Sequence, residues 1–170
     1  MIDLLILYEL NKSPLTMYGI SRNIKSDFNV FMLPSLGTIQ PALKRLEKQG
    51  AITHQKFMSA GGRPSKCYAI TSAGKDALSE LLISSMPENP IQFLVNARLR
   101  LYCAQNLSDD NINKLVKQLK RKTESILIES KKKLENDDLT FYPKMVVDNL
   151  NCEYKNFLLL LEGIEHACKH

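Results

Sequence analysis

Basic side chains are concentrated in one short part of this sequence, residues 38–75. Seven lysines and arginines lie there beside a single acidic residue, Glu47. Residues 86–170 hold thirteen basic and twelve acidic residues, so the excess positive charge belongs to the N-terminal half. Lysine and arginine bind phosphate through charge and hydrogen bonds, which favours a polyanion as the partner of this stretch. The net charge of +5 and the isoelectric point of about 9.0 agree with such a partner but do not require one.

The first group of these side chains falls on a predicted helix, TIQPALKRLEKQ, residues 38–49. Its core face carries four apolar residues at helical spacing: Ile39, Ala42, Leu43 and Leu46. Its candidate binding residues are Thr38, Gln40, Lys44, Arg45 and Lys48. Thr38 is favoured as the cap, because Pro41 then falls in the first turn, where its missing N–H costs little. A cap at Ser35 stays open and also leaves the binding face outward, and Gly50 closes the helix in either case.

The second group falls on a predicted β-hairpin. Two runs with strand-like alternation flank the sequence SAGGRPS, residues 59–65. Gly61 and Gly62 allow a tight turn that can approach another molecule closely. Arg63 then lies at the tip, where a narrow minor groove of DNA would favour its guanidinium. Lys66 follows on the second strand and is expected to contact phosphate.

The order of the predicted elements is three helices, the hairpin and a fourth helix. The first three helices are expected at residues 2–11, after the cap Thr16, and at 38–49. The strands of the hairpin are expected at 51–58 and 66–70, and the fourth helix at 72–84. Two short helices and a turn followed by a hairpin indicate a winged helix-turn-helix domain over residues 1–85, in a mainly α protein with a two-stranded wing. An unspecialised α+β domain is the alternative. Residues 2–10 are apolar almost all round, which predicts burial on more than one face.

Residues 90–170 are predicted to form a C-terminal α-helical dimerisation region, after the linker SMPENP. Its helices are expected at residues 91–106, 109–136 and 143–168. The last helix repeats apolar residues in steps of three and four, as a heptad seam does: Val147, Leu150, Tyr154, Phe157, Leu161, Ile164 and Cys168. This seam, with the apolar helix at 2–10, predicts a homodimer. An amphipathic helix packed on its own chain is the alternative.

The sequence lacks the motifs of several other functions. It contains no nucleophile elbow, Walker loop or paired-carboxylate site, so no enzyme activity is predicted. His54 has no acid or cysteine near it in the sequence, and the HACKH pattern at 166–170 is interpreted as a frayed end. No metal or cofactor is expected. The four cysteines are scattered, the N-terminus is a poor signal peptide and no apolar run could span a membrane, which together predict a cytoplasmic protein.

Two runs of the sequence resemble the PadR family of winged-helix transcriptional regulators. They are PSLGTIQPALKRLEKQGAI, residues 34–52, and GGRPSKCYAITSAGK, residues 61–75. The residues that match the family pattern are Gly37, Thr38, Ile39, Pro41, Ala42, Leu43, Arg45, Leu46, Gly50, Gly61, Gly62, Arg63, Tyr68, Thr71 and Gly74. The resemblance covers about residues 2–82, and the C-terminal half is similar only in length and kind. Gln40 stands where the family usually has Tyr, and Met17 precedes Tyr18 where Gly is usual.

The resemblance implies a dimeric repressor that binds double-stranded DNA with the helix at 38–49 in the major groove. In that geometry Gln40 pairs with adenine, Lys44 contacts a base or a phosphate, and Lys48 meets phosphate. Some members of the family respond to small aromatic molecules. The aromatic residues that could line such a site are Phe93, Tyr102, Phe141, Tyr142, Tyr154 and Phe157, although core packing is expected of most. A winged helix that docks proteins without reading DNA is the alternative function, and the basic wing argues against it.

Overall fold

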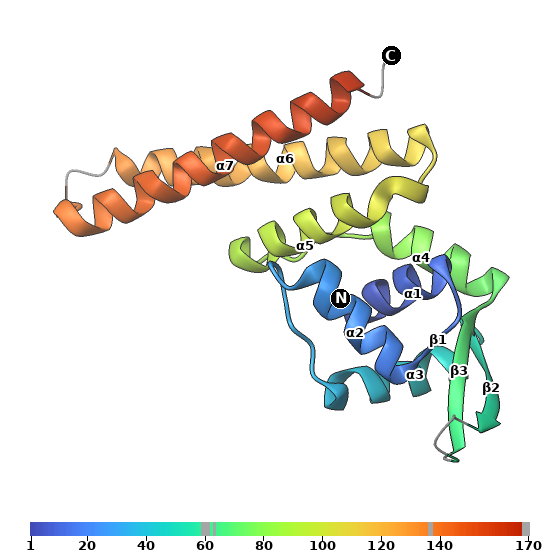
Figure 1. The fold of residues 1–170 in the computed structure, drawn as a ribbon. Coiled ribbons are helices and arrows are strands. Elements are labelled where there is room, and N and C mark those ends of the chain that lie inside the picture. Colours follow the sequence, from blue (N-terminus) through green and yellow to red (C-terminus); the bar gives the residue numbers. More distant parts are fainter. Residues whose placement is uncertain (59–61, 63, 136–137, 168–170) are drawn as a thin grey trace. The chain divides into compact units, whose positions relative to one another are not determined.

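The computed structural model of this protein describes residues 1–58, 62, 64–135 and 138–167. The chain divides into two compact units, Met1–Asn106 and Leu107–His170. Unit 1 contains α1 (Ile2–Lys12), β1 (Leu15–Thr16), α2 (Met17–Phe28), α3 (Leu36–Lys48), β2 (Ile52–Met58), β3 (Pro64–Ile70), α4 (Ser72–Ile83), α5 (Pro90–Cys103) and the short 3-10 helix η1 (Ala104–Asn106). Unit 2 contains α6 (Asp109–Leu134) and α7 (Phe141–Ala167). The protein is therefore mainly α with a winged helix-turn-helix, as predicted, followed by C-terminal helices (Figure 1).

The sheet of unit 1 has three antiparallel strands in the order β1-β3-β2. β2 and β3 form the wing, with His54 opposite Tyr68. β1 pairs with the other edge of β3, where Leu15 lies opposite Tyr68 and Thr16 lies opposite Cys67. The sequence predicted only the two strands of the wing. It did not predict β1, because a strand of two residues is too short to show an alternating pattern.

Helix α1 is enclosed within unit 1, where it contacts α2, α3, α4 and β3. Leu5, Ile6 and Leu7 are each 0% exposed, which confirms the predicted burial on more than one face. The apolar side chains of α1 are therefore already covered by their own chain. The apolar sequence of α1, from which a place in a dimer interface was predicted, is thus explained by burial within unit 1.

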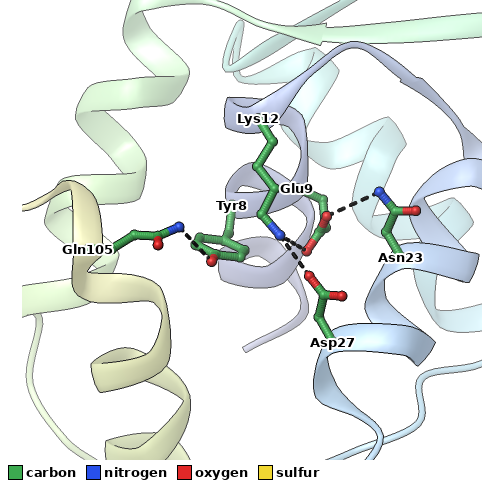
Figure 2. A network of polar contacts seen from close by, with 6 residues as sticks. All are labelled: Tyr8, Glu9, Lys12, Asn23, Asp27 and Gln105. Atoms are coloured by element: carbon green, nitrogen blue, oxygen red, sulfur yellow. Dashed lines mark hydrogen bonds and ion pairs between the residues drawn. The ribbon is translucent and has the colours of Figure 1, made fainter.

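A polar network around the buried Glu9 joins α1 to α2 (Figure 2). The Glu9 carboxylate is 0% exposed and accepts hydrogen bonds from Lys12 Nζ at 3.1 Å and Asn23 Nδ2 at 3.3 Å. Lys12 Nζ also bonds to Asp27 at 2.7 Å and lies 4.3 Å from the centre of the Tyr8 ring. Burial raises the pKa of Glu9, although its hydrogen bond from Lys12 opposes the shift. Burial lowers the pKa of Lys12, but the hydrogen bonds to Asp27 and Glu9 outweigh it and leave that pKa raised.

An aromatic cluster joins α5 to α1 and α2. The Tyr102 ring packs edge-on against Phe28, with ring centres 5.0 Å apart, and also meets Tyr8 and Phe31. Beside it, Gln105 in η1 donates a hydrogen bond to the Tyr8 hydroxyl at 2.8 Å (Figure 2). These contacts make α5 part of unit 1.

Arg100 fastens α5 to the end of α4. Its buried guanidinium donates to three carbonyl oxygens, at 3.4, 2.5 and 3.1 Å: those of Leu82, Ser84 and Ser85. The end of a helix leaves carbonyls without helical donors, and Arg100 supplies donors at that point. Burial lowers the pKa of Arg100.

In unit 2, α6 and α7 lie side by side and run antiparallel (Figure 1). Tyr154, Phe157 and Leu161 of the predicted seam are buried. For these residues the seam packs on its own chain, which is the alternative left open by the sequence. Leu159 and Leu160, beside the seam, are 64% and 50% exposed.

The ends of the C-terminal helices differ slightly from the prediction. α7 begins at Phe141, two residues before the predicted start at Pro143, and proline is tolerated in a first turn whose N–H groups have no helical partners. Ser108 is the N-cap residue of α6, as predicted, but its hydroxyl makes no capping hydrogen bond. Cys168 of the seam and His170 of the HACKH pattern lie outside the described residues. Within the described ranges, no helix is long and apolar enough to cross a membrane, and no three potential metal-binding side chains gather.

Candidate nucleic-acid interface

Helix α3 begins earlier in the sequence than predicted. Ser35 is the N-cap residue and the helix starts at Leu36, so the predicted start with Thr38 as cap is wrong. Pro41 therefore lies inside the helix and cannot donate to the carbonyl of Gly37, four residues before it. Because Gly37 is exposed, water can satisfy that carbonyl, which reduces the cost of the missing hydrogen bond.

The two faces of α3 are arranged as predicted. The core face is buried, with every member at most 2% exposed: Ile39, Ala42, Leu43 and Leu46. The candidate binding residues are all exposed: Thr38, Gln40, Lys44, Arg45 and Lys48. The amphipathic pattern fixes this orientation, since burying the core face leaves the polar side chains in solvent.

The end of α3 and the base of the wing are tied together. Gly50 has a φ of 73°, and its N–H and that of Ala51 bond back to the carbonyls of Glu47 and Leu46, each at 3.0 Å. This is a Schellman ending, in which glycine takes the left-handed conformation as predicted. The Thr71 hydroxyl, at the far end of the hairpin, donates to the Gly50 carbonyl at 2.7 Å. The wing is therefore held at a fixed place beside α3.

The start of α4 packs closely against the same point. Thr71 is its N-cap residue, as predicted, and accepts a hydrogen bond from the Gly74 N–H at 3.1 Å. A Cβ at position 74 would lie 2.0 Å from the Ala51 carbonyl oxygen, so only glycine fits there. Thr16 caps α2 in the same way, bonding to Gly19 at 3.1 Å.

A hollow of about 270 Å³ lies where the N-terminus of α2, the exposed side of α3 and β3 meet. Its lining residues are Thr16, Met17, Tyr18, Gln40, Lys44, Glu47, Pro64, Ser65, Lys66 and Tyr68. The structure thus brings together Gln40, Lys44 and Lys66, which lie far apart in the sequence. Thr38, Lys48 and Gly62 do not line the hollow.

Arg45 points elsewhere. Its guanidinium makes two hydrogen bonds to the Asp3 carboxylate, at 3.2 and 2.5 Å, and so ties α3 to α1. The hydrogen bond and the charge of Asp3 raise the pKa of Arg45. Arg45 therefore already has an anionic partner within its own chain.

The wing tip is described only in part. Gly62 has a φ of 71°, a conformation that favours glycine and agrees with the predicted tight turn. Gly61 and Arg63 lie outside the described residues, so their predicted roles stay predictions. Lys66 is exposed on β3.

Several residues that line the hollow were not predicted as site residues, among them Tyr18, Glu47 and Met17. Tyr18 is 69% exposed at the start of α2, and an aromatic residue two positions after a helix cap could have indicated it. Glu47 contacts His54 Nδ1 on β2, a pairing that the sequence alone does not reveal. Met17, which stands where the family usually has Gly, also lines the hollow. Burial, and then the charge of Glu47, raises the pKa of Tyr68.

These observations define a winged helix-turn-helix protein. A model of the PadR-like family of transcriptional regulators matches residues 6–80. A PadR family transcription regulator from Clostridium difficile is 33% identical over 45% of this chain and 78% of its own, with a TM-score of 0.41. By its match to the family model, the chain belongs to the PadR-like family of transcriptional regulators.

Some solved structures match nearly the whole chain, among them the following two. Bacillus subtilis PadR in complex with operator DNA is 23% identical over 98% of both chains, with a TM-score of 0.47. The protein smu.1604c from Streptococcus mutans is 25% identical over 96% of this chain and 98% of its own, with a TM-score of 0.45. No curated protein sequence matches the chain.

Proposed function

We propose that this transcriptional regulator binds double-stranded DNA directly, with α3 in the major groove and the wing beside it. The observation that carries the proposal is the meeting of Gln40, Lys44 and Lys66 at one exposed hollow formed by α3 and β3. A major groove is wide enough to admit an α-helix. The expected ligand of the two lysines is phosphate, since a lysine acts as a point charge toward it.

Base reading is assigned to Gln40. Its side chain is exposed near the start of α3, where helix-turn-helix proteins bring side chains to base edges. A glutamine amide can pair with adenine through two hydrogen bonds. Lys48 lies two turns further along α3 and is expected to meet phosphate. Thr38 and Lys44 are the next candidates for base reading if Gln40 does not read a base.

The experiment is a titration of wild type and three variants against a duplex selected from random sequences and against a scrambled duplex, over a series of salt concentrations. Lys66→Ala should weaken both duplexes alike and make the salt slope shallower by about one unit. Gln40→Ala should cost about 1–3 kcal/mol on the selected duplex only. Lys132→Ala, an exposed lysine of unit 2, is the matched control for loss of charge.

The outcomes separate the two candidate functions. If Lys66→Ala and Lys132→Ala lose the same amount of duplex affinity, the hollow is not part of the DNA-binding surface. If wild type binds no duplex even at low salt, docking of a protein partner replaces DNA binding as the function.

The proposed DNA binding also requires access to the chromosome, in agreement with the cytoplasmic location expected from the sequence.

We also propose that the protein is a homodimer and a repressor. Support for the dimer comes from the apolar side chains that α7 exposes, among them Leu159 and Leu160. Two copies would present two α3 helices to a palindromic site. A small aromatic effector stays a proposal, and three of its candidate lining residues, Phe93, Tyr154 and Phe157, are buried as core.

A further inference from the structure

Among the described residues that line the hollow, Glu47 is the one carboxylate. It shares that lining with Lys44 and Lys66, the side chains assigned to phosphate. A carboxylate next to a phosphate is repelled, because like charges at short distance raise the energy of the complex. It also lies in the last turn of α3, where the helix dipole disfavours an acid. Both effects oppose a negative charge at this position.

His54 on β2 contacts this carboxylate. Its Nδ1 meets Glu47 Oε1, and the two side chains are 22% and 34% exposed. A neutral ring can hold the carboxylate with its Nδ1–H, and a protonated ring also cancels the charge.

The pair belongs to a cluster that spans three elements. The His54 ring lies 5.9 Å from the ring of Tyr68 on β3, measured between centres. Tyr68 lines the hollow, and the charge of Glu47 contributes to its raised pKa. The charge of Glu47, a residue of α3, therefore also acts on the wing.

We infer that His54 is a positioning residue of the DNA-binding face, which holds the Glu47 carboxylate toward β2 so that Lys44 and Lys66 can receive phosphate. This inference rests on the proposed DNA binding. His54 itself does not line the hollow, so its effect passes through Glu47. Base reading by Glu47, which could accept from cytosine, is the competing role for the carboxylate.

The test is a double-mutant cycle measured as duplex affinity in the full-length protein. His54→Ala leaves Glu47 without its partner and should weaken both the selected and the scrambled duplex by about threefold to tenfold. Glu47→Gln removes the carboxylate and should tighten both duplexes slightly. Adding Glu47→Gln to His54→Ala should restore affinity to within about twofold of Glu47→Gln alone. Gln55→Ala, at an exposed neighbour on β2, is the control for disturbance of the strand.

The rescue decides the inference, because a purely structural role for His54 would not be cured by Glu47→Gln. If the double variant stays as weak as His54→Ala, with its thermal unfolding unchanged, the inference is overturned. A change in base preference on Glu47→Gln would also overturn it in favour of base reading. Should wild type bind no duplex at all, the proposed function fails and takes the inference with it, whereas a failed rescue leaves DNA binding intact.

Discussion

Helices α1 and α7 have similarly apolar sequences but opposite surroundings. In α1, Leu5, Ile6 and Leu7 are fully buried by four neighbouring elements of their own unit. In α7, only the stripe that faces α6 is buried, and Leu159 and Leu160 beside it remain in solvent. An apolar sequence therefore does not distinguish a helix at the centre of a unit from one with a surface left over for a partner. The number of neighbours within the unit makes that distinction.

The largest expected difference between the two helices is in the stability of the folded chain. Leu7→Ala should lower the free energy of unfolding by about 2–5 kcal/mol, because it leaves a cavity among packed side chains. Leu160→Ala removes the same atoms from an exposed site and should change it by about 0.5 kcal/mol or less. Urea unfolding followed by circular dichroism, in dilute protein, measures both. Similar losses for the two variants would mean that α7 is as enclosed as α1.

Self-association should respond in the opposite sense. If the exposed face of α7 joins two copies, Leu159→Ser combined with Leu160→Ser should raise the dimer dissociation constant at least about tenfold, since each buried leucine contributes about 1.5–3 kcal/mol. Val30→Ser, at a residue of unit 1 that is 79% exposed, is the matched control. Sedimentation at micromolar concentration provides the measurement. A monomeric wild type, or an unchanged double variant, would contradict the proposed dimer.

The smallest effect concerns the polar side of α1 and depends on pH. The pKa of Glu9 is raised in the folded protein, so the folded state binds more protons than the unfolded state between the two pKa values. Stability contributed by this carboxyl is therefore present at acid pH and lost as the pH rises through the folded pKa. Glu9→Gln abolishes this titration, while Lys12 keeps its bond to Asp27 at 2.7 Å.

The measurement is the free energy of unfolding of both proteins between pH 4 and pH 7. The variant should gain on wild type as the pH rises. A difference that stays constant over this range would mean that Glu9 titrates alike in the folded and unfolded states. Glu80→Gln, at an exposed carboxyl of α4, controls for general loss of charge.

Much of the fold could be predicted because it follows from local patterns. The buried stripe of α3, the caps at Thr16 and Thr71 and the glycine ending at Gly50 each depend on residues within a few positions of one another. The first residue of α3 was harder to predict, because Ser35 and Thr38 are both able to cap a helix. Strand β1 has too few residues for a pattern and exists through its pairing with β3.

The candidate site could be predicted only in part. The structure brings together Gln40, Lys44 and Lys66, which charge and periodicity had marked, while their roles on DNA stay predictions. The contact between Glu47 and His54 was missed because it crosses the turn between α3 and β2, and sequence spacing does not give that geometry. Glu9 was missed for a related reason. Its partner on α2, Asn23, is fourteen residues away in the sequence, too far for a helical spacing pattern to indicate the contact.

Arg100 and Lys66 carry the same charge but differ in how freely another basic residue could replace them. Lys66 stands in solvent, where an arginine would deliver the same charge to a phosphate. Arg100 is buried and reaches three carbonyls after α4 with the spread donors of a planar guanidinium. An ammonium at the end of a lysine would keep the charge there but could not cover the same oxygens. The hydrogen bonds at position 100 need the shape of a guanidinium, whereas the proposed DNA binding needs only a positive charge at position 66.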